Sequence, residues 1–108
     1  MEITRNGPTL VLAGDFDVRS TGEVRNAIYD HLDGDYVSEH PEHAVAIDLS
    51  GVDHVDLTAL RVIAAASRVA AQSGRRVVLR GACPAVRRML HLSHLIRVVE
   101  LEREPISA

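Results

Sequence analysis

The sequence has few of the residues that stabilise small domains by special means. Among 108 residues it contains one cysteine, Cys83, no tryptophan and only 3% aromatic residues. A single cysteine excludes an intrachain disulfide and fits a reducing compartment, so we expect a cytoplasmic location. Because aromatic residues are scarce, the core must consist of aliphatic side chains, and the 46% of hydrophobic residues is enough for one modest domain.

Charge and hydropathy argue against two kinds of partner. The formal net charge of -3 is the opposite of the basic excess typical of nucleic-acid binding. No apolar run approaches the roughly 20 residues of a membrane span, because Arg61 and Arg68 interrupt the longest one, and no signal peptide is visible. We therefore expect neither nucleic acid nor a membrane as partner.

A group of basic residues lies late in the chain. Its members are Arg75, Arg76, Arg80, Arg87 and Arg88. Such a group is typical of solvated helix and strand faces. The alternative is a local basic surface for an acidic partner or a phosphate.

Hydrophobic patterning predicts alternating strands and helices. Short apolar runs bounded by turn residues predict strands at Thr9–Ala13, 44–50, 75–81 and 95–102. Helical spacing predicts helices at 20–32, 57–74 and 83–93, and the polar segment 33–43 is predicted to be a flexible loop. Ser20 or Thr21 is expected to cap the first helix, with Glu23 completing a capping box. This alternation indicates an α/β fold, with the uninterrupted apolar strand 44–50 inside the sheet.

Catalytic and metal-binding motifs are weak. The sequence has no glycine-rich phosphate loop. His31, His40 and His43 lie in or beside the polar loop without ligand spacing, and His91 and His94 lie near a helix end, so no metal or other cofactor is expected. Cys83 precedes Pro84 at a helix start, where a thiol can become reactive, but a small buried residue is the simpler interpretation. We expect no enzyme, and an enzyme using Cys83 is the least favoured hypothesis.

Several aspartates follow the predicted strands. They are Asp15, Asp17, Asp48, Asp53 and Asp56. Aspartate stabilises turns and helix starts, which is the simplest role for each. Functional loops of open α/β sheets also gather at strand ends. The functional interpretation is strongest for Asp56, which separates a buried strand from the longest helix.

Two segments resemble the STAS domain of bacterial anti-sigma factor antagonists. They are LVLAGDFDVRST near the start, and the long stretch that runs from AVAIDLSGVDHVDLTAL through the Gly-Arg-Arg strand and the Pro-headed helix to LIRVVEL. The resemblance implies one domain over 1–108, with a core at about 9–101 and a tail at 102–108. It also implies a mixed four-stranded sheet with helices packed mainly on one side.

The resemblance also implies a function. Proteins of this family bind an anti-sigma factor that is a serine-kinase-like ATPase, and thereby free a sigma factor for transcription. The partner-binding residues that it implies here are Asp15, Asp17, Asp56, Leu57, Thr58 and Ala59. The alternative is a scaffold or ligand-sensing STAS module that is never phosphorylated, and a homodimer is compatible with either function.

The sequence departs from the family at the usual phosphorylation site. That site is a Ser or Thr directly after the acid, but Leu57 follows Asp56 here and has no hydroxyl. Thr58, one residue later, has three interpretations: a helix cap, a displaced phosphorylation site, or an unmodified contact residue. We expect Thr58 to cap or begin the long helix, and we expect Leu57 to be substantially exposed.

Overall fold

The chain begins with a β-hairpin. In the computed structural model, which describes residues 1–40 and 42–102, β1 (Glu2–Asn6) runs antiparallel to β2 (Thr9–Phe16). Gly7, at the turn between them, has a positive φ of 57°, which costs glycine little. β1 was not predicted, because only its Ile3 is apolar and its other side chains are exposed at the edge of the sheet.

The sheet has five strands rather than the predicted four. Their order is β1-β2-β3-β4-β5, where β3 is Val45–Val55, β4 is Val77–Arg80 and β5 is Glu100–Leu101. From β2 onward each neighbouring pair is parallel, so the sheet is mixed, as predicted. The central position of β3, with partners on both sides, explains its unbroken apolar run at Val45–Ile47.

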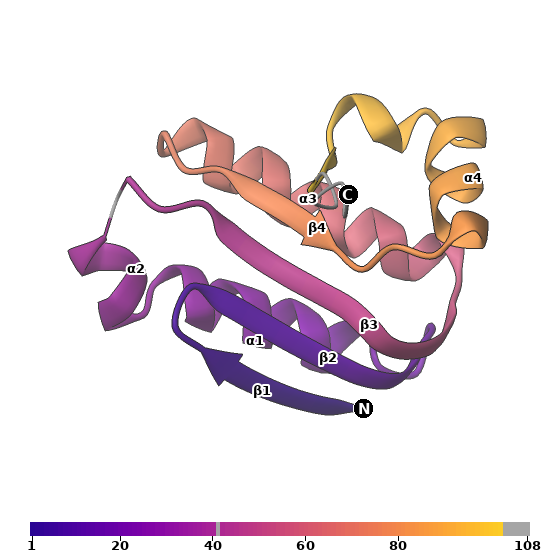
Figure 1. Cartoon of the computed structure of the whole chain (residues 1–108), viewed down its shortest axis with the longest axis horizontal. Helices are drawn as coiled ribbons and strands as arrows, with labels where there is room; N and C mark the ends of the chain where they lie inside the picture. The colour runs from indigo at the N-terminus through magenta and orange to yellow at the C-terminus, as the bar shows by residue number, and fades with distance from the viewer. Residues whose placement is uncertain (41, 103–108) are drawn as a thin grey trace, which may run out of the picture.

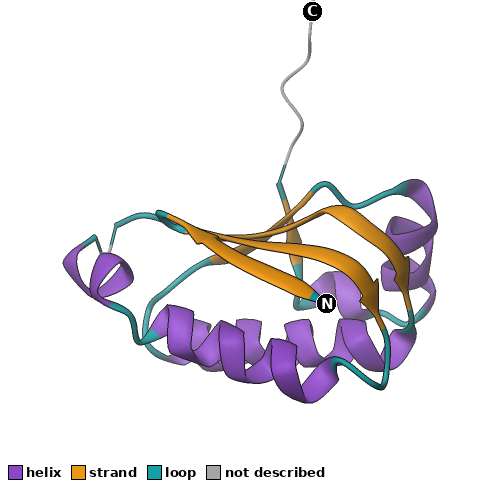
Figure 2. Ribbon diagram, turned by 90° about the horizontal axis from the view of Figure 1, so that it is seen from below, coloured by secondary structure: helices purple, strands orange, loops and turns teal. Residues whose placement is uncertain are grey.

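Two long helices cover one face of this sheet. Figure 2 shows α1 (Thr21–Leu32) and α3 (Leu57–Gln72) under the strands, whereas α4 (Pro84–Leu92) stands at one end of them. The core between the layers is aliphatic apart from one phenylalanine; fully buried members include Leu10, Leu12, Phe16, Ile28, Ile47, Leu60, Ile63, Leu79 and Leu90. Packing of helices on one face of the sheet is thus confirmed.

Two segments differ from the predicted elements. The polar segment 33–43 was expected to be a loop, but it contains the short helix α2 (Asp35–Glu39), whose Val37 is buried. The last predicted strand begins instead with a 3-10 helix, η1 (Leu95–Arg97), and only Glu100–Leu101 pair as β5. His94, which lies between α4 and η1, has a φ of 63°, in the left-handed region.

The predicted capping box of α1 does not form. Ser20 occupies the N-cap position but makes no side-chain cap hydrogen bond. Its hydroxyl instead donates to the Asp15 carbonyl at 2.9 Å and accepts from the Asp17 amide at 3.1 Å. Ser20 therefore closes the turn after β2 instead of capping the helix.

Two further observations concern the C-terminal residues and the possibility of a membrane-spanning helix. Residues 103–108 of the predicted tail lie outside the described residues. Within residues 1–40 and 42–102, none of the helices combines the length and the apolar character that a membrane crossing requires.

Candidate functional site

The parallel strands β2, β3 and β4 end at the same edge of the sheet (Figure 1), and most of the predicted site residues lie at or just after these ends. Asp15 in β2 stands opposite His54 in β3, and Asp56 follows β3 directly. The amide of Asp56 donates to the Phe16 carbonyl at 3.3 Å, which joins the end of β2 to the start of α3. This edge is where open α/β sheets usually place their functional loops.

Asp17 has a structural partner in the turn after β2. Its carboxylate accepts from the Arg19 amide at 2.9 Å and forms an ion pair with the Arg19 guanidinium at 2.7 Å. The side-chain hydrogen bond from Arg19 lowers the pKa of Asp17. Val18, between them, is 67% exposed, so the turn presents an apolar side chain beside a neutralised acid.

Asp56, and not Thr58, is the cap of the long helix. Asp56 has extended backbone angles, and its Oδ1 accepts from the Ala59 amide at 2.8 Å. Thr58 lies two residues inside the helix, is exposed, and makes no side-chain hydrogen bond within the described residues. Thr58 was expected to cap or begin the long helix. It does lie in the first turn of α3, but it is not the cap, because the carboxylate one position outside α3 already satisfies the free amide.

The residues on either side of Thr58 are less exposed than expected. Leu57 is only partly exposed, and Ala59 is fully buried at 0% exposure. Ala59 was expected to contact a partner, but its side chain faces the core and can only support the first turn of α3 from beneath. The accessible part of this turn consists of Leu57 and Thr58.

Leu57 lies in an apolar groove between α3 and α4. The groove has a volume of about 360 Å³ and is lined by Leu57, Ala85, Arg88, Met89, Leu92 and Ser93; we call it the Leu57 groove. Leu92 on its rim is 76% exposed. An apolar groove beside an exposed leucine is suited to receiving an apolar side chain from another protein.

A second hollow adjoins the Leu57 groove. It has a volume of about 300 Å³ and is lined by the ends of β3 and β4 and by α4, including Asp53, His54, Cys83 and the shared residues Ala85 and Met89. Cys83 is exposed, so the expectation of a buried cysteine is wrong. Its side chain makes no cap hydrogen bond, and no histidine bonds to it within the described residues.

The histidines do not form a metal site in the part of the chain described here. His31 is buried and its Nε2 lies 3.0 Å from the Pro8 carbonyl oxygen. His40 stacks on both Tyr36 and His43 near α2, and the His43 ring is tilted relative to the Tyr36 ring. No group of three or more potential ligands converges among the described residues.

Another hollow lies elsewhere, on the sheet face that α1 and α3 leave open. It has a volume of about 540 Å³ and includes two ion pairs, Arg76 with Glu100 and Arg80 with Glu102. The side-chain hydrogen bond from Arg76 lowers the pKa of Glu100. Since each arginine there is neutralised by an adjacent carboxylate, this hollow offers no excess charge to a ligand.

Comparison with protein families identifies the class of this protein. A family model described as "Mlab, STAS domain" matches residues 1–100. The chain therefore belongs to the STAS domain family. No curated protein sequence matches the chain significantly.

Solved structures show the same fold. A candidate anti-sigma factor antagonist from Thermotoga maritima has a TM-score of 0.73 at 20% identity, over 95% of this chain and 86% of its own. An anti-sigma factor antagonist from Mycobacterium paratuberculosis has a TM-score of 0.64 at 22% identity, over 95% and 84%. The antagonist SpoIIAA in its unphosphorylated form has a TM-score of 0.66 at 13% identity, over 96% and 88%. SpoIIAA from Bacillus in its phosphorylated form has a TM-score of 0.60 at 16% identity, over 95% and 91%.

Proposed function

We propose that this protein is a non-enzymatic interaction module of the anti-sigma factor antagonist type. Its partner is a serine-kinase-like ATPase that holds a sigma factor, and binding of this module releases that sigma factor for transcription. The first turn of α3 and the turn after β2 form the contact surface. The observation that supports this proposal most is the pairing of Leu57 with an apolar groove at the edge where functional loops gather.

The chemistry of the edge favours binding over catalysis. Asp17 is paired with Arg19, and Asp56 caps α3 through the Ala59 amide, so both carboxylates have structural roles. Asp15 is exposed beside them and remains a proposed contact. The exposed apolar side chains of Val18 and Leu92 are of the kind that become buried in a protein interface.

Phosphate at the usual family position is not part of the proposed mechanism. Leu57 is the first residue of α3 and has no hydroxyl, and Thr58 is rotated from it by about 100° around the helix axis. A kinase that positions its substrate through Asp56 would find the Thr58 hydroxyl pointing in another direction. Phosphoryl transfer depends on such positioning, so Thr58 is a poor replacement.

The same observation favours a second candidate function. A STAS module that acts as a constitutive scaffold or senses a ligand needs no phosphorylation switch, and Leu57 fits such a module equally well. A homodimer is compatible with this alternative. The two functions differ in whether an ATPase partner exists and whether ATP changes the complex.

Binding to purified ATPases tests the proposal directly. Each serine-kinase-like ATPase encoded in the source genome would be titrated with this protein by isothermal calorimetry, with and without ATP. We expect one of them to bind, and Leu57→Asp to weaken that complex at least tenfold, because a buried apolar anchor is worth roughly 2 kcal/mol or more. Val69→Asp is the matched control, since Val69 is 44% exposed on the same helix but far from the groove.

Three results would contradict the proposal or part of it. Absence of binding by every such ATPase would favour the scaffold or ligand-sensing alternative. Equal binding by wild type and Leu57→Asp, with both proteins folded by circular dichroism, would remove the groove from the interface. Stoichiometric phosphate on Thr58 after incubation with the ATPase and ATP, mapped by mass spectrometry, would restore the usual switch.

A further inference from the structure

The charges of this protein are segregated along the chain. From Leu57 to Val99 there are eight arginines and no aspartate or glutamate, whereas the residues before Leu57 carry most of the acidic side chains. This stretch includes α3, β4, α4 and η1. The chain therefore contains a basic stretch from Leu57 to Val99, although its overall charge is -3.

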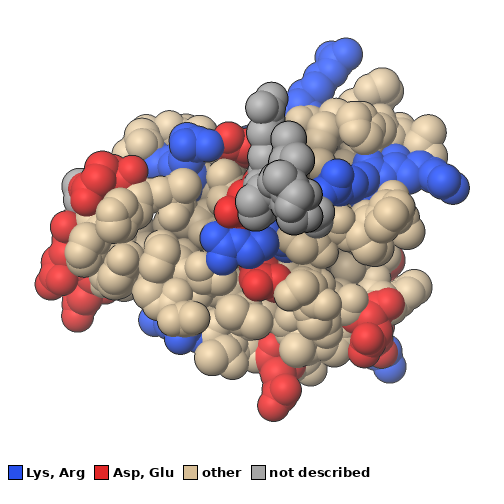
Figure 3. All heavy atoms as spheres, in the orientation of Figure 1, with Lys and Arg blue, Asp and Glu red and all other residues tan. Residues whose placement is uncertain are grey.

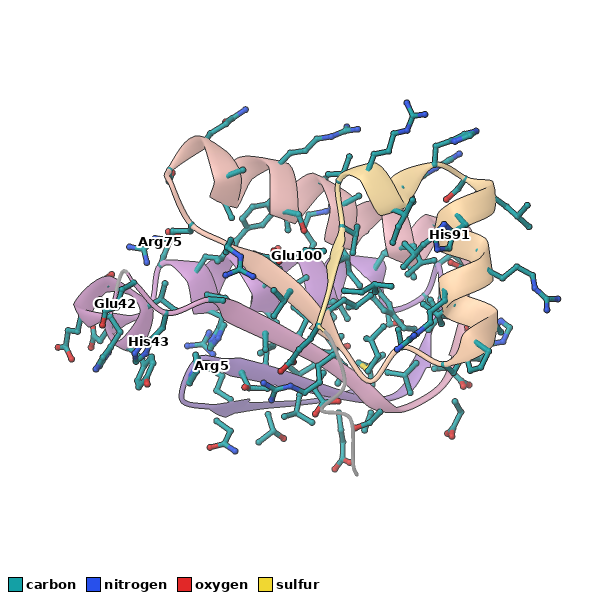
Figure 4. The ribbon with its side chains drawn as sticks, turned by 45° about the horizontal axis from the view of Figure 1, so that its top comes forward. Arg5, Glu42, His43, Arg75, His91 and Glu100 are labelled. Atoms are coloured by element: carbon teal, nitrogen blue, oxygen red, sulfur yellow. The ribbon has the colours of Figure 1, made fainter. Side chains whose placement is uncertain are left out.

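Half of these arginines have identifiable structural partners. Arg76 and Arg80 pair with glutamates on or just after β5, and the Arg87 Nε donates to the Ala82 carbonyl at 3.1 Å. Arg75 reaches the α2 segment, where its guanidinium donates to the Val37 carbonyl at 2.7 Å (Figure 4). These four arginines already bond to groups of this protein, so their guanidinium groups are less available to a partner than those of the other four.

The other four arginines have no such partner. They are Arg61, Arg68, Arg88 and Arg97, which are exposed and make no ion pair or side-chain hydrogen bond within the described residues. Figure 3 shows basic side chains, uninterrupted by acidic ones, on the upper right of the molecule over α4 and η1. Unpaired positive charge thus lies over the elements that form the Leu57 groove.

Two of these arginines are placed to act on an occupant of the groove. Arg88 is part of the groove wall, and it shares the exposed face of α4 with Leu92, four residues later. Arg61 is one helical turn after Leu57 on α3. The groove therefore combines aliphatic lining residues with the cationic side chain of Arg88, Arg61 lies one turn beyond Leu57, and no carboxylate lines the groove.

We propose that the Leu57 groove binds an acidic amphipathic segment of the partner protein. A leucine-like side chain of that segment enters between Leu57, Met89 and Leu92, and carboxylates next to it pair with Arg88 and Arg61. This inference rests on the proposed function and specifies the chemistry of the partner. A nucleic acid is disfavoured as occupant, because the groove contains no aromatic side chain on which a base could stack.

Selection from a random peptide library tests this chemistry without knowledge of the partner. A library of twelve-residue peptides displayed on phage would be selected on the immobilised full-length protein. We expect the selected peptides to combine leucine, isoleucine, methionine or phenylalanine with aspartate or glutamate. The selected peptides would then be synthesised and their affinities measured by fluorescence polarisation.

Charge reversal at two exposed arginines provides the comparison. Arg88→Glu should weaken these peptides by about tenfold or more, because it places a like charge beside their carboxylates. Arg68→Glu makes the same charge change on α3, eleven residues after Leu57, and should leave the affinity within about twofold because exposed charges farther apart than a Debye length are screened. Leu92→Asp should also weaken binding, which identifies the groove as the site.

Four outcomes would overturn the inference. Selected peptides without acidic residues, or peptides that bind Arg88→Glu as tightly as wild type, would exclude an acidic segment. Sedimentation with phosphatidylglycerol vesicles that depends on Arg88 would reassign the surface to a membrane. If the ATPase of the preceding subsection binds and needs Leu57 but not Arg88, the proposed function stands and only this inference fails.

Discussion

Removing the cap of α3 is the most informative perturbation of the candidate site. In Asp56→Ala the Ala59 amide loses its acceptor, which lies at 2.8 Å in the wild type. Loss of such a cap costs about 1 kcal/mol, and loss of a negative charge at a helix N-terminus costs about 0.5 kcal/mol more. The expected loss of unfolding free energy is therefore about 1.5 kcal/mol, or about 6 to 12 °C in Tm for a domain of this size.

Asp56→Asn separates the two contributions. Asparagine is an equally good cap but carries no charge, so this variant should lose only about 0.5 kcal/mol. Thr58→Ala should be neutral or slightly stabilising, because Thr58 makes no side-chain hydrogen bond in the described structure and alanine has the higher helix propensity. From most to least stable, the expected order is Thr58→Ala, wild type, Asp56→Asn and Asp56→Ala, and the first two can be equal.

Urea denaturation followed by circular dichroism at pH 7 measures all four proteins. The reasoning fails if Asp56→Ala unfolds at the same urea concentration as wild type, or if Asp56→Asn is as unstable as Asp56→Ala. A loss of about 1 kcal/mol in Thr58→Ala would show that Thr58 is a second cap.

Three further predictions concern the fold. Amide hydrogens of Ala46–Leu49 should exchange among the slowest in the protein, because β3 has partners on both sides; fast exchange measured by NMR would place this strand at an edge. Gly81→Ala should lower the free energy of unfolding, measured by thermal denaturation, by about 2 kcal/mol or more, since Gly81 has a φ of 73° and a Cβ would lie 2.9 Å from a backbone nitrogen of β3. The control is Gly22→Ala in α1, where a Cβ meets nothing within 4 Å, and this variant should be neutral or stabilising. The hydrogen bond from Arg76 lowers the pKa of Glu100, so the contribution of this ion pair to stability is present above the ordinary value of 4.5 and is lost as the pH falls through the lowered value. Between pH 5 and about 2.5, the unfolding free energy of Glu100→Gln, measured by urea denaturation, should therefore fall less steeply with pH than that of wild type. Equal slopes would contradict this ion pair.

The candidate site could be predicted in part because strand ends and helix starts leave local signals. Asp56 follows an apolar strand and precedes a long segment with helical apolar spacing. This change of pattern correctly predicted where the strand ends at the edge of the sheet. The cap was expected at Thr58 because threonine is a good cap, but the aspartate two positions earlier is one too, and only the backbone angles show which residue is outside the helix. Ala59 was expected to contact a partner because the family resemblance implies it, and only the packing of α3 shows that its side chain is buried.

Edge strands and short helices leave weaker signals than buried elements. β1 has one apolar side chain in five residues, because its other face meets solvent and its outer edge is unpaired. α2 is five residues long, and its single buried residue, Val37, gives no period to detect. The backbone of Val37 is held by Arg75, thirty-eight residues away, which no local pattern reveals.

The sequence by itself determined the α/β alternation, the aliphatic core, the central strand and the family, because each depends on local periodicity or on a contiguous motif. Only the tertiary structure decided the shape of the candidate site. Leu57 and Leu92 are far apart in the chain and become neighbours because α4 returns to the carboxyl end of the strands where α3 begins. The same folding selects which arginines pair with β5 and which remain unpaired near the groove. Distances between side chains of separate elements depend on how those elements pack, and that packing is a property of the whole fold.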